Sequence, residues 1–74
     1  MPRIEAKVSF NNSIAELRHA RELTQQALAD ALDVTRATVI ALEKGDYNPS
    51  LELAFRLSRY FGKPIEDIFH ERNV

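Results

Sequence analysis

Residues 23–50 read LTQQALADALDVTRATVIALEKGDYNPS, and this stretch decides the fold. Its apolar residues recur at the spacing of short amphipathic helices, which we expect at 25–32 and 36–44. Only residues 33–35 separate the two segments, and so short a connection makes two helices cross steeply instead of lying side by side. The stretch therefore predicts a helix-turn-helix over residues 25–44.

Local signals mark the ends of both helices. Thr24 and Thr35 each precede one of them, and a threonine hydroxyl at that position accepts a hydrogen bond from a free amide of the first turn. Gly45 follows the second helix, where glycine commonly ends a helix. The inner faces are then expected to comprise Leu28, Ala29, Leu32, Val39 and Leu42.

Working outward, similar signals predict three more helices. Asn12 or Ser13 can cap the first of them, and Ser50 can cap another that Gly62 ends. Pro64 suits the first position of the last helix. The expected ranges are about 13–22, 51–61 and 64–69, the last followed by a strand or tail to residue 74.

The N-terminal segment has a different pattern. Residues 4–10, IEAKVSF, alternate apolar with polar side chains, which is typical of a half-buried strand. We expect residues 8–10 to pair antiparallel with residues near 70–72. The helix at 51–61 is apolar on more sides than one core face requires, so the N-terminal strand, a second subunit, or both would cover it.

Composition narrows the function classes. The chain has 74 residues, no cysteine and a net charge of −1, so it forms one small domain without disulfides or thiolate metal sites. We expect a cytoplasmic protein, since neither a membrane span nor a signal peptide is visible. The two histidines are far apart and the two glycines form no phosphate loop. We therefore predict no enzyme, no catalytic or metal-binding residues and no cofactor.

Four motifs carry a resemblance to a known family. They are TQxxLA at 24–29, VTRxTV at 34–39, LEKG at 42–45 and YNPS at 47–50, with IEDIF at 65–69 in support. Together they resemble the Xre/Cro family of helix-turn-helix regulators, in its short stand-alone branch, over about Asn12–Phe69. The resemblance implies an all-α, five-helix phage-repressor-like domain. Glu22 and Asp33 stand where the family usually has glycine, and both positions usually take a left-handed backbone.

The resemblance implies double-stranded DNA as the partner, with the second helix of the pair in the major groove. Arg36 is then the main candidate for base recognition, because a guanidinium pairs bidentately with guanine. Gln25, Lys44 and Asn48 are candidates for phosphate contacts. The full set expected to face DNA is Gln25, Gln26, Thr35, Arg36, Ala37, Thr38, Ala41, Lys44 and Asn48.

Arg18 and Glu43 match a family pair that links the first helix to the recognition helix, and we interpret them as a structural ion pair. We expect a homodimer that binds an operator of two half-sites, with the segment 64–74 at the interface through Ile65, Ile68 and Phe69. Repression is expected in preference to activation. A protein-interaction module or an antitoxin-like regulator with the same fold is the alternative, and no small-molecule ligand is evident.

Overall fold

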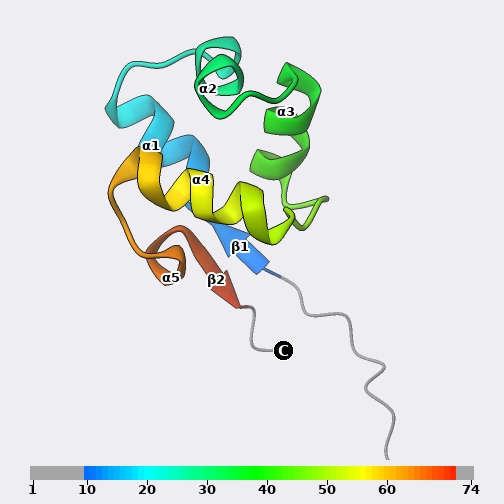
Figure 1. Cartoon of the computed structure of the whole chain (residues 1–74), viewed down its shortest axis with the longest axis vertical. Coiled ribbons are helices and arrows are strands. Elements are labelled where there is room, and N and C mark those ends of the chain that lie inside the picture. Colours follow the sequence, from blue (N-terminus) through cyan, green and yellow to red (C-terminus); the bar gives the residue numbers. More distant parts are fainter. Residues whose placement is uncertain (1–9, 72–74) are drawn as a thin grey trace, which may run out of the picture.

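The computed structural model describes residues 10–71, which form five helices and a two-stranded antiparallel sheet, as the sequence predicts. In chain order the elements are β1 (Phe10–Asn12), α1 (Ile14–Ala20), α2 (Gln25–Leu32), α3 (Arg36–Lys44), α4 (Leu51–Phe61), α5 (Ile65–Ile68) and β2 (Phe69–Glu71). Figure 1 shows α4 in the middle of the molecule, α2 and the start of α3 at one end, and α5 with the sheet at the other.

The three longest helices begin at the hydroxyl caps predicted for them. In each, the hydroxyl oxygen of the cap accepts a hydrogen bond from the backbone amide three residues later, which satisfies one of the free donors of the first turn. These bonds are Thr24 to Ala27 at 3.0 Å, Thr35 to Thr38 at 3.2 Å and Ser50 to Leu53 at 3.1 Å. The starts of α2, α3 and α4 are therefore fixed by local sequence.

Among residues 10–71, two non-glycine residues have left-handed backbones, Glu22 with φ 57° and Asp33 with φ 58°. These are the two positions where the family resemblance implies such a conformation. At Asp33 the turn closes onto α2, since the amide of Val34 donates to the carbonyl of Ala29 at 3.0 Å. At Glu22 the reversal follows the end of α1 at Ala20, which is earlier than the predicted end.

Within the described residues, the N-terminal strand continues two residues beyond its predicted end at Phe10. Residues 4–9 of the predicted strand lie outside the described residues, and β1 extends to Asn12, which we had expected only as a cap. The strand extends this far because β2 supplies its backbone partners, in the register Phe10 to Glu71, Asn11 to His70 and Asn12 to Phe69. The antiparallel pairing predicted near residues 70–72 is thus present.

Ser13 occupies the N-cap position of α1, but the side chain of Asn12 supplies the hydrogen bond to the first turn. The Oδ1 atom of Asn12 accepts a hydrogen bond from the amide of Ile14 at 3.1 Å, and its Nδ2 atom donates to the carbonyl of Leu42 at 2.8 Å. The Ser13 hydroxyl makes no cap bond and lies 3.2 Å from Nε2 of His70. The Ser13 side chain therefore links the start of α1 to His70 of β2.

The last helix is shorter than predicted. It starts at Ile65, one residue after Pro64, and it ends at Ile68 because Phe69 already belongs to β2. Backbone pairing with Asn12 of β1 thus takes Phe69 out of the predicted helix.

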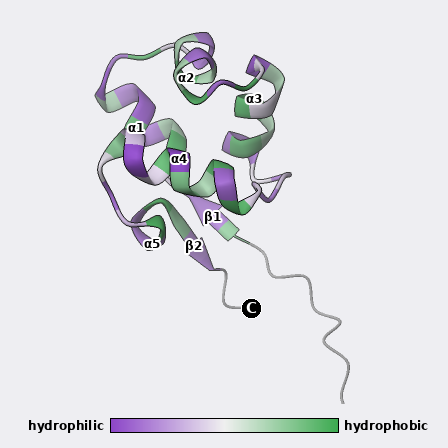
Figure 2. Cartoon of the chain, viewed as in Figure 1, coloured by the Kyte–Doolittle hydropathy of each residue, from purple (hydrophilic) through white to green (hydrophobic). Residues whose placement is uncertain are grey.

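One apolar cluster holds all five helices together. Its centre is α4, whose Leu53, Leu57 and Phe61 recur at helical spacing on the inward face. The buried members are Ile14, Leu28, Ala29, Leu32, Val39, Leu42, Leu53, Leu57, Phe61 and Ile68, so the predicted inner faces of α2 and α3 are confirmed. Figure 2 shows the same division along α4, with apolar and polar residues alternating around the helix.

Candidate nucleic-acid interface

The pair α2 and α3 forms a helix-turn-helix. The two helices pack against each other, and Figure 1 shows that they cross instead of running parallel. Leu28, Val39 and Leu42 are fully buried within the angle between them. The outer face of α3 is therefore presented by a packed unit and not by an isolated helix.

The first turn of α3 is open to solvent. Arg36 and Ala37 are exposed, and the Arg36 guanidinium has no acceptor among residues 10–71. The side chains of Thr38 and Ala41, further along the helix, are half-buried, and Lys44 is exposed at its end. The chain thus exposes one long, forked hydrogen-bond donor at the start of α3, flanked by small side chains.

The cap residue Thr35 is exposed, and its hydroxyl is already occupied. It accepts from the amide of Thr38 and also lies 3.0 Å from the Thr38 hydroxyl. Because each hydroxyl oxygen has two lone pairs and one hydrogen, both threonines retain some capacity for a further bond.

The two glutamines at the start of α2 differ. Gln26 is exposed, and its Nε2 atom donates to Asp30 of the same helix at 2.9 Å. Gln25 is half-buried, and its Nε2 atom donates across the fold to Oε1 of Glu43 in α3 at 3.1 Å. Sequence reasoning missed this link, since no local pattern connects residues 18 positions apart on two different helices.

Beneath these glutamines lies the predicted ion pair. Nε of Arg18 is 2.6 Å from Oε2 of Glu43, and Nη2 of Arg18 is 3.2 Å from Oε1. The two side chains are only 11% and 9% exposed, respectively. A further bond from Nη1 of Arg18 to the carbonyl of Leu23, at 2.8 Å, also ties the segment before α2 to this pair.

The environment of Glu43 favours its charged form. Burial alone would raise the pKa of its carboxyl group, but hydrogen bonds from Arg18 and Gln25 and the charge of Arg18 outweigh burial, so that the pKa lies below its ordinary value. The hydrogen bond to Glu43 raises the pKa of Arg18, against the opposing effect of desolvation. Glu43 is thus a buried, paired carboxylate and not a group that faces a nucleic acid.

The loop between α3 and α4 carries the last predicted DNA contact. Asn48 is exposed, and no partner for its side chain occurs among residues 10–71. Lys44 at one side of the loop is likewise unpaired within the described chain, whereas Asp46 adds a negative charge between the two. The basic character of this surface is therefore modest.

The residues predicted for the dimer interface do not share one environment. Ile65 and Phe69 are half-buried, but Ile68 is 0% exposed and belongs to the core. Because a side chain fully enclosed by its own chain cannot touch a second subunit, Ile68 is removed from the predicted interface. Within the described part of the chain, the most exposed large apolar residues are instead Leu51 at 72%, Phe55 at 48% and Tyr47 at 41%.

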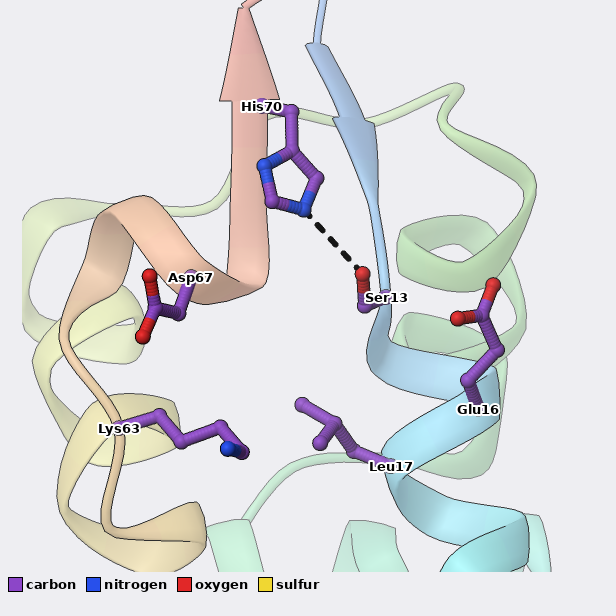
Figure 3. A pocket seen from close by; sticks show the side chains of 6 residues that line it. All are labelled: Ser13, Glu16, Leu17, Lys63, Asp67 and His70. Carbon is purple, nitrogen blue, oxygen red and sulfur yellow. Dashed lines mark hydrogen bonds between the residues drawn. The ribbon is translucent and has the colours of Figure 1, made fainter.

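A pocket of about 400 Å³ lies at the other end of the molecule, between α1, the α4–α5 turn and β2. Figure 3 shows its lining of Ser13, Glu16, Leu17, Lys63, Asp67 and His70. Half of these residues are charged, and most of them are exposed. Within residues 10–71 no cluster of three histidine or acidic side chains is placed to hold a metal ion, and no helix there has the length and apolar character to cross a membrane.

Comparison with known proteins identifies relatives of the whole helical region. The helix-turn-helix family model matches residues 14–68. An HTH-type transcriptional regulator of Methanocaldococcus jannaschii is 52% identical over 60 residues, which cover 81% of this chain and 91% of that protein. The transcriptional repressor RstR of the cryptic phage CTXphi, from Vibrio cholerae, is 36% identical over 80% of this chain and 53% of its own length.

A solved structure shares the fold. The crystal structure of the transcriptional regulator VanUg superposes with a TM-score of 0.78, covering 100% of this chain and 99% of that one, at 20% sequence identity. At that identity the match supports the arrangement of the helices, including the crossing of α2 and α3. It does not extend to individual side chains.

Proposed function

This chain belongs to the helix-turn-helix family of transcriptional regulators, and from that premise we propose that it binds operator DNA as a homodimer and represses transcription. Family and fold are those of DNA-binding regulators, which are not enzymes. The observation that carries the proposal is the unpaired, exposed Arg36 at the start of a helix whose other face is locked into the core.

In the proposed complex the first turn of α3 enters the major groove. Arg36 then donates two parallel hydrogen bonds to O6 and N7 of a guanine, the commonest specific contact in that groove. Ala37 and Ala41 are small enough to let the helix approach, and their methyl groups fit beside thymine. Thr35 and Thr38 each supply one further hydroxyl.

Phosphate contacts set the register of the complex. The backbone amides of Gln25 and Gln26, at the N-terminus of α2, have no acceptor among residues 10–71, and such amides favour anions. The side chains of Gln25, Gln26, Lys44 and Asn48 surround the same face in this proposal. These contacts orient the protein but do not read sequence.

We assign the dimer interface to the outward face of α4 and the adjoining flank of α5, which pack against each other. Leu51 and Phe55 lie four residues apart on one helical face and are the apolar side chains that the chain itself covers least well. Ile65 and Phe69 add half-buried apolar surface from α5 and β2. A two-fold contact would separate the two α3 helices by one DNA turn, about 34–36 Å. Among the named relatives, the phage repressor RstR, 36% identical, supports repression, whereas BcrR of Enterococcus faecalis, 31% identical, is named as a transcriptional activator.

A selection from random DNA with the purified chain tests this function. We expect enrichment of a two-fold symmetric site whose half-sites are centred about 10 base pairs apart, each with an invariant guanine. In sedimentation the chain should be a dimer, and Leu51→Ser should weaken the dimer without unfolding the chain, since Leu51 is 72% exposed. Failure to enrich any sequence would contradict the function and favour the protein-interaction alternative.

A further inference from the structure

We propose that Glu43 is a positioning residue for the DNA contact made by Gln25, holding one hydrogen of the Gln25 amide so that the other points outward to a phosphate. This inference rests on the proposed function, and it adds a residue that touches no DNA to the binding machinery. Three observations support it: the shared carboxylate, the donor count of the amide and the contrast with Gln26.

The Glu43 carboxylate serves two partners at once. Its Oε2 atom is occupied by Nε of Arg18 at 2.6 Å, and its Oε1 atom accepts from both Nη2 of Arg18 and Nε2 of Gln25, at 3.2 and 3.1 Å. Arg18 comes from α1, Gln25 from α2 and Glu43 from α3. The bidentate arginine fixes the carboxylate, and the fixed carboxylate then fixes the glutamine.

The Gln25 amide retains one donor for a ligand. A side-chain amide carries two N–H groups on its nitrogen, and only one of them is used in the bond to Glu43. The two N–H bonds diverge in the plane of the amide, so holding one of them sets the direction of the other. Since Gln25 is half-buried, its side chain also has less freedom to rotate than an exposed one.

Gln26 is a natural control on the same helix. It is also a glutamine at the start of α2, but it is exposed and its partner Asp30 is exposed and lies on the same helix. A bond of that kind holds a side chain weakly in water. If burial and the link to α3 are what orders Gln25, then Gln25 should be rigid and Gln26 mobile before any DNA is added.

The arrangement has a consequence for recognition. Glu43 lies two turns from Arg36 on the recognition helix, so the phosphate contact of α2 is tied to the helix that reads the bases. A shift of α3 would move the Gln25 side-chain amide with it, because Glu43 holds that amide. The carboxylate thus couples the register of the phosphate contact to that of base recognition.

NMR relaxation of the side-chain amides of the free chain tests the ordering without any DNA. We expect an order parameter for Gln25 near that of rigid backbone, about 0.85, and below about 0.6 for Gln26. Glu43→Asp keeps the charge for Arg18 but withdraws the carboxylate from Gln25, and it should bring Gln25 close to the value of Gln26. Equal mobility of the two glutamines in the unaltered chain would overturn the proposal, whether or not Glu43→Asp folds.

DNA titration then tests the consequence. We expect Gln25→Ala to weaken DNA binding about tenfold per protomer and Glu43→Asp to weaken it about threefold. The double variant, Gln25→Ala with Glu43→Asp, should bind no more weakly than Gln25→Ala alone. Gln26→Ala is the control and should have a smaller effect than Gln25→Ala. Losses that multiply in the double variant would contradict coupling. If the unaltered chain bound no DNA while Gln25 was rigid, the proposed function would fail and the structural link would stand.

Discussion

Arg36 and Glu43 lie two turns apart on α3, yet their surroundings are opposite. Arg36 is exposed and unpaired within residues 10–71, whereas Glu43 is 9% exposed and bonded to α1 and α2. The far end of the helix is thus held by the fold, and the near end projects from it. One short helix thus carries a side chain held by the fold at one end and a side chain free of it at the other, so we expect that Arg36 can be changed without loss of the fold.

We expect the largest change in the free energy of unfolding at the anchored end of α3, where Glu43 lies. Glu43→Ala leaves the buried Arg18 without its partner, and breaking a buried pair in this way costs about 3–5 kcal/mol. For a domain of this size that loss approaches the whole stability. Urea unfolding followed by circular dichroism would measure it.

A paired replacement checks the reason for that loss. Arg18→Met together with Glu43→Leu removes both charges and should recover most of the stability, because no uncompensated charge remains buried. A double variant as unstable as Glu43→Ala would show that packing at this site, and not the unpaired charge, is what matters.

The cap of α3 should have the next largest effect. Thr35→Ala removes the hydroxyl that satisfies the amide of Thr38, at a cost of about 1 kcal/mol. Thr35→Ser keeps the oxygen and should cost much less. Hydrogen exchange of the first turn of α3 would locate the effect, and protection unchanged in Thr35→Ala would show that the cap does not hold this turn.

Acid should weaken the anchored end gradually. Folding lowers the pKa of the Glu43 carboxyl group. The contribution of the carboxylate to the free energy of unfolding is therefore complete above the unfolded pKa of about 4.3, and it is lost as the pH falls through the folded pKa. The loss should be smaller than in Glu43→Ala, since a protonated carboxyl still accepts a hydrogen bond. The stability difference between the unaltered chain and the Arg18→Met, Glu43→Leu variant should change with falling pH, and a constant difference would contradict the lowered pKa.

Features set by neighbouring residues could be predicted from the sequence. The hydroxyl caps at Thr24, Thr35 and Ser50 each depend on an amide three residues away, so a local pattern identifies them. The left-handed positions at Glu22 and Asp33 came from the family resemblance and not from residue type. The Arg18–Glu43 pair likewise came from the resemblance.

Features set by distant residues could not be predicted. Ser13 is a good cap residue, but His70, 57 positions away, lies within reach of its hydroxyl. The bond between Gln25 and Glu43 depends on how α2 crosses α3. The burial of Ile68 was missed because a helix of four residues is too short for periodicity to identify its inner face.

The exposed end of α3 should contribute least to stability. Arg36→Ala is expected to change the free energy of unfolding by less than about 0.5 kcal/mol, because the side chain contacts nothing that the fold requires. Urea unfolding alongside Glu43→Ala would provide the contrast directly. A loss above about 1 kcal/mol would mean that the two ends of the helix are not separated in function.

One titration tests most directly whether Arg36 reads a base from an anchored helix, as we propose. Arg36→Ala and the unaltered chain are each titrated against the best selected operator and against the same operator with the invariant guanines replaced. We predict that Arg36→Ala loses about 1–3 kcal/mol of binding free energy per half-site on the first DNA and little on the second. Equal losses on both DNAs would contradict the account, because Arg36 would then hold phosphate and not a base.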